Sequence, residues 1–125
     1  ANEIERRYGS RGLHATSVHP GLIGDTGLSK HMPAGEMAAL GAIEQFSRTM
    51  KSLEQGAATT VWAAIAKEWG TKGGRYLVDC TEGVPAEADS SLYDSAFHAP
   101  FAYDAKKEER LWKDSLKIVG LVDNE

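Results

Sequence analysis

Two segments of this 125-residue chain have the character of β-strands, and helical patterns separate them. Residues 13–18 (LHATSV) have the apolar content of a short strand, and residues 75–80 (RYLVDC) follow a glycine-rich turn. Strands that are joined through helices form a parallel pair with a right-handed crossover. A sheet of two parallel strands cannot bury both faces, because helices normally cover each side of a wider sheet. The pattern therefore predicts an α/β fold in which both strands belong to a larger sheet.

Helical patterns account for most of the remaining chain. Ser52 and Gln55 have the spacing of a capping box, which predicts that a helix begins directly after Ser52. Trp62 and Trp69 lie seven residues apart on one face of that helix, and we interpret them as core residues. Residues 81–102 are rich in alanine, serine, aspartate and proline and are expected to be irregular. The predicted helices cover residues 1–8, 36–50, 53–69 and 104–121.

Composition excludes several classes of function. Hydrophobic residues make up 42% of the chain and charged residues 26%, which is typical of one globular domain. The formal net charge is −4 and no more than two basic residues are adjacent, so neither nucleic acid nor an anionic membrane is expected as a partner. The sequence contains no apolar run of about 18 residues that could span a membrane. Cys80 is the only cysteine, which excludes an intrachain disulfide and predicts a reducing, cytoplasmic setting.

The four histidines do not indicate a metal site. His14, His19, His31 and His98 show none of the histidine and cysteine spacings that are typical of metal ligands. His19 follows the first predicted strand, and we interpret it as a packed side chain beside the next loop rather than as a base. No metal ligand is therefore predicted.

A loop with three glycines follows the first strand directly. It lies within residues 17–31 (SVHPGLIGDTGLSKH), and such small-residue loops allow a ligand to approach the backbone. Gly21, Gly24 and Gly27 are spaced by three and do not form the G-x-G-x-x-G pattern of a phosphate-binding turn. The loop is therefore a candidate ligand site of another kind.

Five short blocks of sequence, taken in order, resemble one family of enzymes. The similarity is to the C-terminal part of a short-chain dehydrogenase/reductase, in particular to the retinol dehydrogenases and WW-domain oxidoreductases with their fungal members. The resemblance implies a Rossmann-type, doubly wound parallel sheet, of which residues 1–125 supply the last two strands and the surrounding helices. The blocks are HPG at 19–21, TGLSKH at 26–31, EQGAATTVWAA at 54–64, GGRYLVDC at 73–80 and RLWKDSLKIVGL at 110–121.

The resemblance also implies a cofactor site. In similar enzymes the loop after the sixth strand lies against the nicotinamide end of NAD or NADP, and the resemblance slightly favours NADP. Gly21 would let the backbone approach the cofactor, and a threonine four residues further on usually binds it. Asp25 stands at that position, so either the loop bulges and Thr26 takes the role, or Thr26 is not the ligand. The implied cofactor-binding residues are Pro20, Gly21, Leu22, Ile23 and Thr26.

The helix expected over residues 36–50 corresponds to the variable substrate-binding region of the family. Met37, Leu40 and Phe46 either line a pocket for a moderately apolar alcohol or carbonyl substrate, or they pack in the core. A homo-oligomer is compatible with the resemblance.

The catalytic residues of the family have no counterpart in this chain. They are a Tyr-x-x-x-Lys pair on a long helix and a serine on the preceding strand, and they would all lie before residue 1. Tyr103 and Lys107 match the spacing, but they follow the last strand, and we interpret them as part of a solvated helix start. Two functions stay open. The chain is either the C-terminal segment of an NAD(P)-dependent oxidoreductase, inactive by itself, or a truncated, non-catalytic binding or scaffolding relative.

Overall fold

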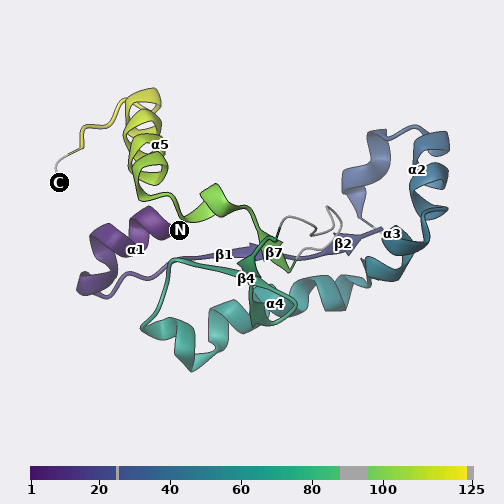
Figure 1. Ribbon diagram of the computed structural model, residues 1–125, viewed down its shortest axis with the longest axis horizontal. Coiled ribbons are helices and arrows are strands. Elements are labelled where there is room, and N and C mark those ends of the chain that lie inside the picture. The colour runs from purple at the N-terminus through teal and green to yellow at the C-terminus, as the bar shows by residue number, and fades with distance from the viewer. Residues whose placement is uncertain (25, 88–95, 124–125) are drawn as a thin grey trace.

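The computed structural model describes residues 1–24, 26–87 and 96–123 (Figure 1). The helices in this part of the chain are α1 (Asn2–Tyr8), α2 (Ala34–Gly41), α3 (Glu44–Thr49), α4 (Leu53–Ile65) and α5 (Ala105–Ile118). Its strands are β1 (Thr16–His19), β2 (Leu22–Ile23), β3 (Met50–Lys51), β4 (Arg75–Val78), β5 (Thr81–Glu82), β6 (Val84–Pro85) and β7 (Phe97–His98). Short 3-10 segments connect them: η1 (Gly9–Arg11), η2 (Gly27–His31), η3 (Lys67–Gly70) and η4 (Pro100–Tyr103).

In the largest sheet of the described chain, β4 is the central strand and β1 lies at one edge. They pair in parallel, from Thr16 opposite Arg75 to His19 opposite Val78. Strand β5 lies at the other edge of β4 and runs antiparallel to it. The predicted parallel pairing of the two segments is confirmed, although β1 begins later than the apolar pattern indicates.

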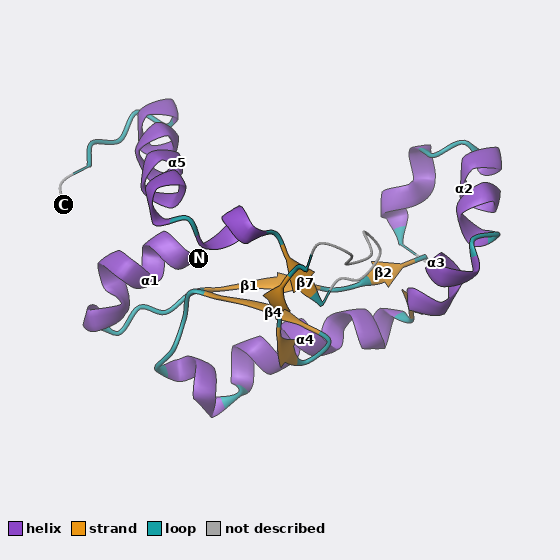
Figure 2. Ribbon diagram, in the orientation of Figure 1, coloured by secondary structure: helices purple, strands orange, loops and turns teal. Residues whose placement is uncertain are grey.

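Helix α4 forms the crossover between the two parallel strands. It contacts both β1 and β4, and Figure 2 shows it running along one side of the sheet. The predicted capping box is present. The Ser52 hydroxyl accepts a hydrogen bond from the Gln55 amide at 3.2 Å, and the Gln55 side chain accepts one from the Ser52 amide at 2.9 Å. These two bonds satisfy amides at the start of α4 that have no partner within the helix.

The crossover helix ends earlier than predicted. Helix α4 ends at Ile65, Ala66 is extended, and Trp69 lies in η3 rather than on the helix. In a continuous helix, residues seven apart are about 10 Å apart along the axis. The break at Ala66 instead brings the ring of Trp69 edge-on to Trp62, with ring centroids 5.1 Å apart. Trp69 is buried, so its predicted place in the core is confirmed.

The single helix predicted over residues 36–50 is wrong. Helix α2 ends at Gly41, Ile43 is extended, and the shorter α3 begins at the next residue. Glycine is a poor helix former, which favours the interruption at this point. The last residue of the pattern, Met50, begins β3, which pairs in parallel with β2. This second pairing ties the loop after β1 to the segment before α4.

The segment after β4 is more regular than predicted. Asp79 and Cys80, expected to end a strand, form a two-residue turn between β4 and β5, with φ angles of +51° and +55°. Positive φ at both central residues is the mark of the hairpin turn whose twist matches the strands. Within residues 81–102, expected to be irregular, the described part contains β5 and a parallel pair of β6 with β7.

Helices α1 and α5 lie together at one end of the molecule (Figure 1). Arg7 on α1 pairs with Glu3 at 2.6 Å and with Asp123, beyond the end of α5, at 2.8 Å. Arg6 pairs with Glu108 on α5. These ion pairs join segments from the two ends of the sequence. Asp104 caps the start of α5, because its carboxylate accepts hydrogen bonds from the backbone amides of Lys106 and Lys107.

The buried hydrophobic residues of the described chain are few. They are Trp69, Leu77 and Val78, and the polar Thr59 on α4 is buried beside them. Leu53, Val61 and Ile65, on the same helix, are exposed. Helix α4 thus covers the sheet with one side and presents an apolar stripe on the other.

Replacing Thr59 by valine tests how α4 holds the hairpin turn. The Thr59 hydroxyl accepts a hydrogen bond from the Cys80 amide at 3.2 Å, and Thr59 is 2% exposed. Valine keeps the shape but removes the acceptor, so Thr59→Val should lower the free energy of unfolding by about 1 kcal/mol. Urea denaturation measures this. The exposed neighbour provides the control, because Thr60→Val should change stability by less than about 0.5 kcal/mol. Equal effects of the two substitutions would contradict this assignment.

Candidate functional site

The loop after β1 is shaped by Gly21 and His19. Gly21 has a φ of +84°, in the left-handed region that glycine adopts without steric cost. Its amide donates a hydrogen bond to Nδ1 of His19 at 3.0 Å. Burial, together with the positive charge of Lys51, lowers the pKa of His19, which favours the neutral ring that this bond requires. The His19 ring also lies edge-on to Tyr76, with centroids 6.4 Å apart. The structure therefore gives His19 a packing and loop-holding position.

Leu22 and Ile23 continue from the loop as β2. They lie opposite Met50 and Lys51 of β3, so strand pairing occupies one edge of their backbone. On the other side Ile23 packs against Gly56 of α4, where an added Cβ would lie 2.7 Å from Ile23 Cγ1. The buried Gly56 therefore lets the loop lie close to the crossover helix.

Lys51 covers the position where Gly21 lacks a side chain. A Cβ on Gly21 would lie 2.5 Å from Cδ and 2.9 Å from Nζ of Lys51. The Lys51 ammonium forms an ion pair with Asp79 in the turn between β4 and β5. Lys51 and Asp79 were not singled out in the sequence, because nothing local indicates that residues 28 positions apart would meet across two loops.

The remaining predicted cofactor residues lie around this loop. Pro20 is exposed and precedes Gly21, and Thr26 is partly buried after β2. Asp25 lies outside the described residues, so the alternative between Asp25 and Thr26 stays open. The structure thus places Pro20, Gly21, Leu22 and Ile23 consecutively at one edge of the sheet, with Thr26 following them.

The predicted substrate residues lie on two helices near the same end of the molecule. Met37 and Leu40 belong to α2, and Phe46 belongs to α3. Figure 1 shows α2 and α3 at the end where β2 lies, away from α1 and α5. The side chains of these three residues lie outside the described part, so pocket lining and core packing both remain predictions.

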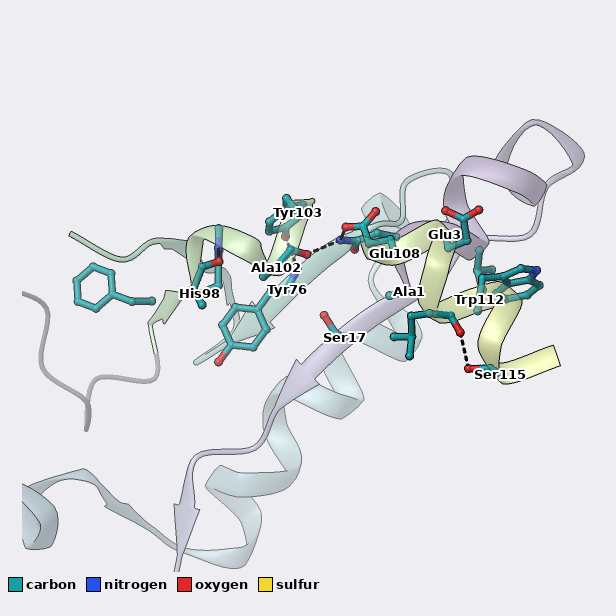
Figure 3. Close-up of a pocket in the computed structure, with 15 residues that line it drawn as sticks. Ala1, Glu3, Ser17, Tyr76, His98, Ala102, Tyr103, Glu108, Trp112 and Ser115 are labelled. Atoms are coloured by element: carbon teal, nitrogen blue, oxygen red, sulfur yellow. Dashed lines mark hydrogen bonds between the residues drawn. The ribbon is translucent and has the colours of Figure 1, made fainter. Parts of the chain in front are cut away.

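A pocket of about 650 Å³ lies between the β1–β4 pair and helices α1 and α5 (Figure 3). Ser17 and Tyr76 contribute from the sheet, and Trp112 contributes from α5. His98 lies between two tyrosines, 6.4 Å from the Tyr76 ring and 4.6 Å from the Tyr103 ring. Burial raises the pKa of Tyr76. No local pattern in the sequence indicates this pocket, because its residues come from α1, β1, β4, β7, η4 and α5.

Of the two residues with Tyr-x-x-x-Lys spacing, Tyr103 lines this pocket and Lys107 does not. The Tyr103 hydroxyl accepts a hydrogen bond from the Tyr76 amide at 3.0 Å. The Lys107 ammonium lies 3.3 Å from the Asp104 carboxylate and 5.6 Å from the centre of the Phe101 ring. The two functional groups thus have different partners.

The described residues contain neither a candidate metal centre nor a helix that could span a membrane. No group of three or more histidine, cysteine, aspartate or glutamate side chains in that part of the chain could hold a metal ion. Among the same residues, no helix has the length and apolar character needed to cross a membrane.

Comparisons with known proteins show which sequences this chain is similar to. The chain is 46% identical over 120 residues to the short-chain dehydrogenase/reductase prx1 of Penicillium rubens, which covers 96% of this chain and 34% of that protein. It is 41% identical over 128 residues to the oxidoreductase calI of Penicillium decumbens, covering 97% and 36%. It is 36% identical over 93 residues to the WW domain-containing oxidoreductase of Gallus gallus, covering 74% and 22%. No family model and no solved structure matches the chain.

The fold and these likenesses agree on a class of protein. The described chain is a mixed α/β structure with a parallel strand pair, a crossover helix and a glycine-containing loop at the carboxyl end of a strand. The chain is a relative of the short-chain dehydrogenases/reductases, and the resemblance predicted from its motifs is confirmed. It spans about a third of the length of the fungal relatives that it matches.

Replacing Gly21 by alanine tests the geometry of the loop. An alanine at φ +84° is strained, and its Cβ would displace the Lys51 side chain, so Gly21→Ala should lower the free energy of unfolding by about 1–2 kcal/mol. Thermal or urea denaturation measures the loss. Gly27→Ala is the matched control, because a Cβ at Gly27 meets nothing within 4 Å and should leave stability unchanged or slightly raised. A neutral Gly21→Ala would show that the loop is not held as described.

Proposed function

We propose that this chain is part of an NAD(P)-dependent oxidoreductase that acts on an alcohol or carbonyl substrate. In this proposal its strands are the last two of a Rossmann-type, doubly wound parallel sheet. The observation that carries it is the glycine loop at the carboxyl end of β1, in a chain 46% identical to a short-chain dehydrogenase/reductase.

The position of the loop supports a ligand site. In open α/β sheets, ligands bind outside the carboxyl ends of the parallel strands. His19 ends β1 and lies opposite Val78, which ends β4, so the loop after β1 and the turn after β4 share one edge. The nicotinamide of the cofactor is proposed to lie at this edge.

The residue types in the loop are suited to binding a nicotinamide ring. Gly21 adopts the left-handed backbone of the loop with the Lys51 side chain in the place of its own, and Leu22 and Ile23 are held in place by β3. Their remaining main-chain groups would orient the carboxamide, and Thr26 would add a hydroxyl. When bound, the cofactor would supply or accept the hydride. The chain's own contribution is to bind and orient the nicotinamide.

The proton donor or acceptor is proposed to come from the sequence before residue 1. Hydride transfer to a carbonyl needs an acid within about 2.6–3.2 Å of the substrate oxygen. In the described chain, Tyr103 bonds the Tyr76 amide at the pocket of Figure 3, and His19 bonds Gly21. Both groups are thus engaged. A Tyr-x-x-x-Lys pair upstream, on a helix that continues into α1, would supply the acid instead.

The small size of the hydrophobic core supports the proposal that these strands belong to a larger sheet. Trp69, Leu77 and Val78 are the buried hydrophobic residues of the described chain, while the apolar stripe Leu53, Val61 and Ile65 is exposed. Further strands and helices would cover such surfaces in a complete Rossmann domain. The substrate is proposed to be a small, moderately apolar alcohol or carbonyl that contacts Met37, Leu40 and Phe46.

The proposal is tested by comparing the activity of the protein expressed from its full reading frame with that of the 125-residue chain. The protein expressed from its full reading frame should oxidise NADH or NADPH with aldehydes and ketones, measured by absorbance of the reduced cofactor. The 125-residue chain alone should neither turn over nor bind a dinucleotide tightly, because it has no glycine-rich phosphate turn after a strand. Tyr103→Phe should leave the activity of the longer protein unchanged. Turnover by the short chain that depends on Tyr103 would contradict the proposal. A folded longer protein that binds neither cofactor would support the non-catalytic alternative.

Replacing Gly21 by valine in the longer protein tests the loop itself. A branched side chain there is strained at φ +84° and crowds Lys51, so the loop should move away from the cofactor. We expect the dissociation constant for NAD(P)H to rise about tenfold, or about 1.4 kcal/mol, by fluorescence titration. Gly27→Val serves as the control. Unchanged affinity in a folded Gly21→Val protein would remove the loop from the cofactor site.

A further inference from the structure

We propose that Lys51 positions the glycine loop after β1 by bridging it to the β4–β5 turn through its ion pair with Asp79. Lys51 would act through the loop, without touching substrate or cofactor. Its expected effect on cofactor binding rests on the proposed function, whereas its effect on the loop does not.

Lys51 connects the loop to its surroundings in two ways. Its backbone lies in β3 opposite Ile23, and its alkyl chain lies over Gly21, 2.5 Å from the place of a Cβ. Its side chain is 20% exposed, so the ammonium is held in a partly enclosed space. Lys51 also immediately precedes Ser52, the cap of α4. A movement of Lys51 would therefore change both the loop and the start of the crossover helix.

Asp79 is a fixed partner for this lysine. It lies in a tight turn after Leu77 and Val78, which are fully or almost fully buried. The next residue, Cys80, donates its amide to the buried Thr59 on α4 at 3.2 Å. The hairpin, the core and α4 therefore hold the turn from three sides, and Asp79 presents its carboxylate from a defined position.

The loop is attached through a short strand, a hydrogen bond and the packing of Ile23 against Gly56 of α4. Strand β2 has two residues, and the Gly21 amide bonds the His19 ring. The β4–β5 turn is the more rigid of the two segments. We therefore expect the Lys51–Asp79 pair to restrain the loop rather than the turn. The charge of Lys51 also contributes to lowering the pKa of His19, which favours the neutral ring that accepts from Gly21.

Four variants of the protein expressed from its full reading frame test this assignment. Lys51→Met removes the charge and keeps the alkyl chain, and Asp79→Asn removes the charge at a left-handed position that asparagine tolerates. Lys51→Arg retains the pair. Lys72→Met is the control, because the ion pair of Lys72, with Glu82 of β5 at 2.9 Å, joins other residues than Lys51 and Asp79; the Lys72 ammonium also lies 5.0 Å from the centre of the Trp69 ring.

Amide hydrogen exchange and kinetics are measured on each variant. Lys51→Met and Asp79→Asn should each speed exchange of residues 21–23 about two- to fivefold, the range of a partly exposed ion pair. The KM for the cofactor should rise by a similar factor with kcat little changed. The double variant should be no worse than either single one. Lys51→Arg should behave as the parent protein, and Lys72→Met should not affect the loop.

Each remaining outcome decides one part. Unchanged exchange of residues 21–23 in both charge-removing variants overturns the positioning role of Lys51. Faster exchange with an unchanged KM for the cofactor would show that Lys51 positions the loop, and would overturn the proposed effect of Lys51 on cofactor binding. If the parent protein binds neither NADH nor NADPH, the proposed function fails, and the exchange result still decides whether Lys51 holds the loop.

Discussion

The parallel ladder between β1 and β4 determines which parts of this chain can meet. It sets His19 opposite Val78, so the segments that follow the two strands emerge side by side although the whole crossover separates them in sequence. A parallel pair requires such a long connection, and α4 provides it along one side of the sheet. The glycine loop, the Asp79–Cys80 turn and the beginning of α4 therefore share one edge.

Close packing at that edge depends on the smallest residues. Gly56 lets Ile23 lie against α4, and Gly21 leaves room for the Lys51 side chain. Ser52 begins α4 next to Lys51, so the helix start and the loop partner are neighbours in sequence as well as in space. The packing of the loop thus requires small residues at Gly21 and Gly56. It also involves the long side chain of Lys51, which reaches from the loop to Asp79.

Local patterns in the sequence predicted the parts of the structure that local physics decides. The capping box at Ser52 and the apolar content of the two strands were sufficient, because neighbouring residues make those contacts. The end of α4 at Ile65 could not be predicted in this way, since Trp62 and Trp69 meet only because the chain leaves the helix at Ala66. The turn at Asp79 was likewise hidden, because its left-handed backbone depends on β5 pairing back onto β4. The pocket of Figure 3 gathers residues from both ends of the chain and has no local signal.

The partial exposure of the Lys51–Asp79 pair suits a loop that is proposed to receive a ligand. Lys51 is 20% exposed and Asp79 is 50% exposed, so solvent screens the pair and its contribution is about 1 kcal/mol or less. A fully buried pair would carry a large desolvation cost and would leave an unpaired charge whenever the loop moved. A pair at this depth restrains the loop in its resting position, while a ligand that contacts Gly21 to Ile23 can still shift it by a small amount. The same partial exposure makes the restraint sensitive to salt, because screening weakens partly exposed pairs more than buried ones.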